Sequence, residues 1–242
     1  MISKFRKFFK GANQSSRELL HNSKKSDDIY AMAILQPLLN NQPYLPFNGG
    51  ALRPICIAYI LNEIIINNRK TILEFGCGLS TIMMARMLKR NNISATIHSV
   101  EHNSTWAGIV QNYLDQEGLQ NFVTLIHTDL VPFETPVGTV NGYDISKVKT
   151  EVNGKRFDLI IVDGPPAYLK TTRHSRFPVL LNINSFVSDD FCVILDDVNR
   201  EGEQTIINHV RENNKGLKYS TLSKTMGIFK KHESFNPLPI HY

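Results

Sequence analysis

The chain has 242 residues, of which 42% are hydrophobic and 20% are charged, with a net charge of +5 and an isoelectric point near 9.0. This size and composition predict a soluble globular protein with a substantial core, and they exclude disordered, collagen-like and disulfide-scaffold proteins. The three cysteines are widely spaced and odd in number, so they form neither a CxxC metal knuckle nor a paired extracellular framework. A reducing, cytoplasmic location is therefore expected.

The positive charge is concentrated at the amino-terminal end of the chain. Residues 1–25 contain seven basic residues and one acidic residue, a net charge of +6, whereas the remaining 217 residues carry a net charge of −1. Ile2, Phe5 and Phe8 recur there at helical spacing between cations, which is typical of a short helix lying on a membrane surface. The other hypotheses for this basic arm are a frayed terminus, or a helix packed on its own domain or on a second subunit of a homo-oligomer. Any membrane contact would be peripheral, at the inner face of the membrane.

Helices are predicted first, at residues 27–40 and 51–67, and strands and helices alternate after them. The predicted strands cover residues 71–75, 95–100, 122–127, 157–163, 191–195, 217–222 and 226–230, and the later helices cover residues 80–89, 105–115 and 203–213. Most of these strands are apolar on both faces, as a parallel sheet covered by helices on both sides requires. The last two strands have no helix between them and are expected to pair antiparallel at the sheet edge. The predicted fold class is α/β: a Rossmann-like, doubly wound, mostly parallel seven-stranded sheet with a terminal antiparallel strand and extra amino-terminal helices.

The chain is expected to have three parts. These are the basic arm at residues 1–25, helices at residues 26–69 that cover the site, and a catalytic domain at residues 70–242 with a polar insertion at residues 130–156. The pairs Asn141-Gly142 and Asn153-Gly154 are turn signals inside this insertion. They predict a hairpin or a mobile flap.

A glycine-rich turn follows the first predicted strand, where residues 71–81 read TILEFGCGLST. The helix begins directly after the turn, so bare backbone at Gly76 and Gly78 and a helix amino terminus face the carboxyl edge of the sheet. Glu101 ends the next predicted strand, where its carboxylate can accept hydrogen bonds from both hydroxyls of a ribose. Together the two features favour a nucleoside-containing ligand. A nicotinamide dehydrogenase is disfavoured, because Thr81 stands where its third glycine is expected.

The strings LEFGCGLST, VEHN, VDGPP and LDD resemble the class I S-adenosylmethionine-dependent methyltransferases, and among them bacterial O-methyltransferases of polysaccharide and secondary-metabolite biosynthesis. The resemblance implies S-adenosylmethionine as cofactor and a small-molecule or glycan acceptor. It places Glu74, Gly76, Gly78 and Ser80 around the amino-acid part of the cofactor and Glu101 at the ribose. It also places His102 and Trp106 beside the adenine and Asp129 at the adenine amine, and Asp163 is a further candidate cofactor-binding residue.

Three acidic residues end the later strands of the predicted sheet. Asp163 follows one strand and Asp196 and Asp197 follow the next, so neighbouring strands would bring the carboxylates together. This arrangement resembles catechol O-methyltransferase and related metal-dependent enzymes, although the pair here is Asp-Asp and not Asp-Asn. It implies a Mg²⁺ site. Alternatively, Asp197 pairs with Arg200 or caps the following turn.

Methyl transfer to an alcohol needs help with removal of the alcohol proton, from a metal or from a base. Asp163 and His174 are the candidate catalytic bases of a metal-independent enzyme. The cationic segment at residues 170–176, which includes His174, is also a candidate for holding an acidic substrate. The expected acceptor is a saccharide or a sugar-bearing metabolite. A non-catalytic binding module is the hypothesis from a different class.

Methyltransferases that modify amino groups of DNA bases or of glutamine carry Asn or Asp before Pro-Pro and an aromatic residue after it. Here Gly164 precedes the two prolines and Ala167 follows them. The neutral charge of residues 26–242 also disfavours a surface that binds duplex nucleic acid. No nucleic-acid partner is therefore expected.

Overall fold

A computed structural model describes residues 22–240, and its centre is a seven-stranded sheet in the order β3-β2-β1-β6-β7-β9-β8. The strands are β1 (Thr71–Phe75), β2 (Thr96–Glu101), β3 (Val123–His127), β6 (Phe157–Val162), β7 (Val187–Leu195), β8 (Lys218–Leu222) and β9 (Met226–Lys230). The first five of these run parallel, and β9 pairs antiparallel with both β7 and β8. The Rossmann-like, mostly parallel fold with an antiparallel edge is thus confirmed.

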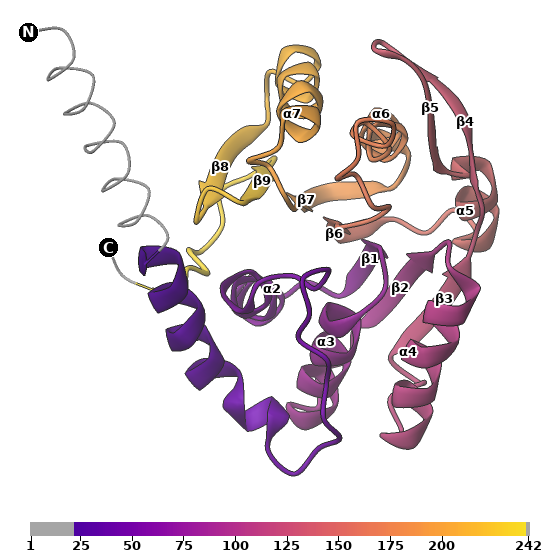
Figure 1. Cartoon of the computed structure of the whole chain (residues 1–242). Coiled ribbons are helices and arrows are strands. Elements are labelled where there is room, and N and C mark those ends of the chain that lie inside the picture. Colours follow the sequence, from indigo (N-terminus) through magenta and orange to yellow (C-terminus); the bar gives the residue numbers. More distant parts are fainter. Residues whose placement is uncertain (1–21, 241–242) are drawn as a thin grey trace, which may run out of the picture.

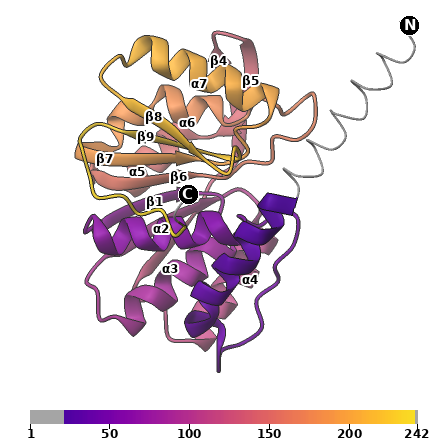
Figure 2. The same ribbon diagram turned by 90° about the vertical axis from the view of Figure 1, so that its left-hand side faces the viewer.

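Helices cover both faces of the sheet (Figures 1 and 2). One face carries α2 (Pro54–Ile66), α3 (Leu79–Arg90) and α4 (Ser104–Gln116), and the other carries α5 (Ile145–Glu151), α6 (Phe177–Leu181) and α7 (Glu201–Asn213). A 3₁₀ turn, η1 (Ile183–Ser185), follows α6. Two buried apolar cores result, one between the sheet and α2–α4 and the other between the sheet and α5–α7. The sheet is therefore buried on both faces, as its apolar strands require.

The helical segment before the sheet begins earlier than predicted. Residues 22–39 are helical, so the expected boundary at residue 25 falls inside a helix. Residues 1–21 of the basic arm lie outside the described residues.

Arg86 of α3 connects the amino-terminal segment to the domain. Its buried guanidinium pairs with Glu117 at 2.7 Å and donates hydrogen bonds to the carbonyls of Leu38 and Pro43.

The insertion forms a hairpin followed by a short helix. Strands β4 (Leu130–Thr135) and β5 (Gly138–Tyr143) pair antiparallel, and α5 returns the chain to β6. The predicted hairpin is confirmed, but the turn at Asn141-Gly142 is wrong, because these residues lie inside β5 and the turn lies at residues 136–137. Gly142 is needed for packing, since a Cβ there would come within 2.7 Å of Pro178 Cγ. Asn153 and Gly154 do form a turn and have positive φ angles.

All three cysteines, Cys56, Cys77 and Cys192, are buried and unpaired, as expected. Within residues 22–240, the helices are too short or too polar to cross a lipid bilayer.

Candidate functional site

The carboxyl edge of the parallel strands borders two adjoining cavities. The larger cavity has a volume of about 610 Å³ and is lined by residues from the β1, β2, β6 and β7 ends. The smaller cavity, of about 200 Å³, lies beneath residues 45–52. Gly76, Cys77 and Asp163 line both cavities. Cavities of this size at the carboxyl edge of an open α/β sheet are where ligands bind in such folds.

The glycine turn connects β1 to α3 and allows the chain to pass close to a neighbouring turn. Gly76 has a φ of 102°, and a Cβ at this position would lie 2.7 Å from the backbone nitrogen of Gly164. Only glycine therefore fits where the turns after β1 and β6 meet. Gly76, Gly78 and Ser80, which the sequence analysis placed beside the cofactor, all line the smaller cavity.

Glu74 has a different environment from the predicted one. Its fully buried carboxylate accepts hydrogen bonds from Ser80 (2.5 Å), Thr81 and Ser99 (2.7 Å). Burial raises its pKa, and the three hydroxyls oppose that rise. Glu74 is not among the described residues that line either cavity. Its side chain fixes the first turn of α3 and the neighbouring strand β2.

Glu101 ends β2 and lines the larger cavity with 5% of its surface exposed. Its Oε1 accepts hydrogen bonds from the backbone nitrogens of His102 (2.8 Å) and Asn103 (2.7 Å), which fix the carboxylate in place. The His102 ring lies beside it, with Nδ1 2.9 Å from Oε1. Both residues line the larger cavity.

Asp163, Asp196 and Asp197 converge as predicted from the strand ends. The register pairs Val162 of β6 with Leu195 of β7, so the next residues lie side by side, and carboxylate atoms of all three aspartates lie within 4.8 Å of one another. Burial raises the pKa of both Asp163 and Asp196, and at Asp196 the neighbouring Asp163 carboxylate raises it further. The cluster therefore has a strong tendency to gain a proton or a cation.

Arg176 is the cation that the structure places against this acidic cluster. Its side chain is 3% exposed, and Nη2 lies 3.1 Å from Asp197 Oδ2 and 3.6 Å from Asp163 Oδ1. The guanidinium also donates hydrogen bonds to the backbone carbonyls of Pro165 and Asp196. The expected pairing of Asp197 with Arg200 is confirmed at 2.8 Å.

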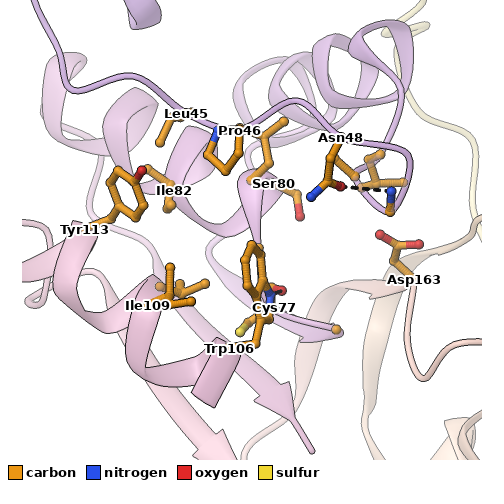
Figure 3. Close-up of a pocket in the computed structure, with 17 residues that line it drawn as sticks. Leu45, Pro46, Asn48, Cys77, Ser80, Ile82, Trp106, Ile109, Tyr113 and Asp163 are labelled. Carbon is orange, nitrogen blue, oxygen red and sulfur yellow. Dashed lines mark hydrogen bonds between the residues drawn. The ribbon is translucent and has the colours of Figure 1, made fainter. Parts of the chain in front are cut away.

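The smaller cavity has an apolar end and a polar end (Figure 3). Leu45, Ile82 and Tyr113 lie at the apolar end, and Asp163 lies at the other. Trp106 stands between the cavities and lines both of them, and its indole nitrogen donates a 2.7 Å hydrogen bond to the Cys77 carbonyl. Residues of the segment 45–52 thus line the smaller cavity.

Two predicted site residues are not part of the cavity walls described above. Asp129 is exposed, and His174 precedes α6 in a half-buried position; neither is among the described residues that line the cavities. The basic residues of the cationic segment at residues 170–176 have different partners. Arg173 points towards Glu201, at 3.6 Å, whereas Arg176 is buried against the acidic cluster.

The sequence analysis missed two groups that line the larger cavity. The first is Tyr143, which ends β5 of the insertion. The second is the pair Arg53 and Thr225. Arg53 directly precedes α2, Thr225 lies in the turn before β9, and the Arg53 guanidinium donates a 3.3 Å hydrogen bond to the Thr225 hydroxyl. No local motif marks them, because an aromatic residue at a strand end usually belongs to the core and the other two residues are 172 positions apart. Only the tertiary fold brings them to the cavity.

Comparisons with known proteins agree with this geometry. The family model described as "Methyltransferase domain" matches residues 73–198, just over half of the chain. An SAH-bound methyltransferase from Podospora anserina has 14% sequence identity and a TM-score of 0.55, over 84% of this chain and 95% of that chain. An O-methyltransferase from Bacillus cereus in complex with SAH has 15% identity and a TM-score of 0.53, over 85% of this chain and 91% of that chain. No curated protein sequence matches the chain.

Proposed function

This chain belongs to the methyltransferase domain family, and from this premise we propose that it is an S-adenosylmethionine-dependent O-methyltransferase acting on a small polar acceptor. One observation carries the proposal. The glycine turn, Glu101 and Asp163 line a single cavity, which gives a nucleoside site and a reaction site at the two ends of one ligand. The SAH bound in structures of similar fold supports this choice of cofactor.

In this proposal the cofactor extends from Glu101 to Asp163. The Glu101 carboxylate accepts hydrogen bonds from the two ribose hydroxyls, because its Oε1 is already aligned by two backbone N–H groups. The amino-acid part would lie against Gly76, Gly78 and Ser80, and the absence of side chains at the two glycines leaves the main chain accessible there. The sulfonium methyl then faces the acidic cluster.

Methyl transfer breaks the bond between the sulfonium sulfur and the methyl carbon while the acceptor oxygen forms a new bond to that carbon. The acceptor hydroxyl must also lose its proton. Asp163 lies at the junction of the two cavities, and its raised pKa makes it a stronger proton acceptor than an ordinary aspartate. His174 is not among the described residues that line the cavities, so Asp163 is the proposed base of a metal-independent reaction.

We further propose that Asp163, Asp196 and Asp197 bind a divalent cation, Mg²⁺ in the cell. Three carboxylates within 4.8 Å provide the oxygen ligands that Mg²⁺ prefers. When bound, Mg²⁺ would lower the pKa of a coordinated acceptor hydroxyl. A specific observation favours the metal-independent alternative: the Arg176 guanidinium already lies 3.1 Å from Asp197. Titration with Mn²⁺ alone, followed by electron paramagnetic resonance, distinguishes the metal-assisted from the metal-independent reaction. The metal-assisted proposal requires that the wild-type chain binds Mn²⁺ and that Asp196→Asn does not. Absence of Mn²⁺ binding by the wild-type chain would overturn it.

The proposed acceptor is a saccharide or a sugar-bearing molecule. Beyond the acidic cluster the larger cavity is lined by Arg53, Arg200 and Thr225, which offer hydrogen-bond donors suited to a hydroxyl-rich ligand. Tyr168 lies at the same cavity with 71% of its surface exposed and presents an aromatic face on which a sugar ring can pack.

Calorimetry with S-adenosylhomocysteine tests the cofactor. The wild-type chain should bind, and Glu101→Gln should weaken binding by at least about tenfold, because the amide keeps the backbone contacts but loses the charge and one acceptor for the ribose. Glu212→Gln, on the exposed surface of α7, is the matched control and should bind like the wild type. Absence of binding by the wild-type chain would overturn the proposed function.

A further inference from the structure

Tyr143 has a buried hydroxyl without a hydrogen-bond partner. The residue is fully buried at the end of β5, and its Oη is among the few buried side-chain polar atoms of residues 22–240 that lack a partner. A phenol hydroxyl that leaves water without a new partner is unfavourable, so such groups in native proteins usually have one. The lack of a hydrogen-bond partner for the Tyr143 hydroxyl therefore needs an explanation.

The hydroxyl lies next to Gly164, and both residues line the larger cavity. A Cβ added to Gly164 would clash with Tyr143 Oη and would lie 2.9 Å from Gly76 Cα. The hydroxyl thus lies where the turns after β1 and β6 meet, in space that Gly164 leaves open. Its ring packs against the His102 ring, with the ring centroids 6.0 Å apart.

The ring of Tyr143 is held independently of its hydroxyl. It packs in a tilted arrangement on Phe75, with ring centroids 5.6 Å apart, and belongs to the apolar core beneath α5–α7. A phenylalanine would make the same contacts, so core packing does not account for the hydroxyl. Its position on the wall of the larger cavity suggests that its partner is a ligand.

We propose that Tyr143 is a cofactor-positioning residue whose hydroxyl donates a hydrogen bond to the bound S-adenosylmethionine, between the ribose held by Glu101 and the sulfur directed at Asp163. Glu101, Asp163 and Tyr143 all line the larger cavity, so a ligand that fills this cavity borders all three residues. The β4–β5 insertion thereby contributes directly to cofactor binding. This inference rests on the proposed function, since it takes the same cofactor as its ligand.

The test compares Tyr143→Phe with the wild-type chain in two measurements. In the ligand-free protein the variant should be at least as stable as the wild type, with a melting temperature unchanged or raised by about 2–4 °C, because an unpaired buried hydroxyl has been removed. By calorimetry its affinity for S-adenosylhomocysteine should fall by about tenfold. Tyr219→Phe, on β8 against Phe229, is the matched control and should leave the affinity unchanged.

The outcomes separate the two proposals. If the wild-type chain does not bind S-adenosylhomocysteine, the proposed function fails. If the wild-type chain binds and Tyr143→Phe binds equally well, the function stands and the role of Tyr143 is overturned. A marked loss of stability in the ligand-free variant would also overturn it, because the hydroxyl would then have a structural partner.

Discussion

At the scale of single residues, Glu74 shows how a buried carboxylate can organise the glycine turn through hydrogen bonds to hydroxyl groups. Replacement by alanine would leave three buried hydroxyls, of Ser80, Thr81 and Ser99, without their acceptor. We expect Glu74→Ala to lower the free energy of unfolding by about 3 kcal/mol or more, measured by urea denaturation. Ser99→Ala, which removes one donor only, should cost about 1 kcal/mol. Unchanged stability of Glu74→Ala together with lost cofactor binding would contradict the structural role.

His98 gives a residue-scale prediction about pH. It is buried in β2, where burial and the nearby Lys155 ammonium, 3.0 Å from Nε2, lower its pKa. The unfolded chain, with a histidine pKa of about 6.5, therefore binds more protons than the folded chain below that pH. The free energy of unfolding should fall as the pH drops through 6.5 and below. His98→Leu should reduce this slope, whereas His232→Gln, at an exposed position, should preserve it.

At the scale of elements, most of the fold could be predicted from the sequence, because each strand and long helix has its own hydrophobic pattern. Strand β1 begins and ends at the predicted residues, and the expected convergence of Asp163 with Asp196 follows from the parallel register. The short helix α6 was not predicted, since five residues are too few to show a helical period. The turn at Gly142 was wrong because glycine there serves a contact with a distant element, which local sequence does not reveal.

That contact between β5 and α6 leads to an element-scale prediction. In Gly142→Ala the new methyl group would lie 2.7 Å from both Pro178 Cγ and the Ser175 carbonyl, so the hairpin would have to move away from α6. We expect a loss of about 1–3 kcal/mol in the free energy of unfolding. Gly108→Ala in α4, where nothing lies within 4 Å, should instead stabilise the chain by about 0.5–1 kcal/mol. Equal effects of the two changes would show that the close contact is not under strain.

At the scale of the whole molecule, the excess of positive charge and the candidate functional site lie in different parts of the chain. Residues 1–25 carry a net charge of +6, whereas the larger cavity is lined by Glu101 and the three aspartates of the acidic cluster together with Arg53, Arg176 and Arg200. The neutral body therefore forms the site, and the basic arm has no part in lining it among the described residues. The helix at residues 22–39 connects the two, because Arg53 at the cavity pairs with Asp28 and donates to the Lys24 carbonyl.

These contacts determine where the arm can be removed. Deletion of residues 1–21 keeps both partners of Arg53, so the affinity for S-adenosylhomocysteine should match that of the full chain in calorimetry. Deletion of residues 1–28 removes Asp28 and the Lys24 carbonyl, which would leave Arg53 without these partners at the cavity wall. We expect this longer deletion to lower the melting temperature and to weaken ligand binding. A severalfold loss of affinity already in the shorter deletion would mean that the arm itself contributes to the site, and the separation of charge from site would not hold.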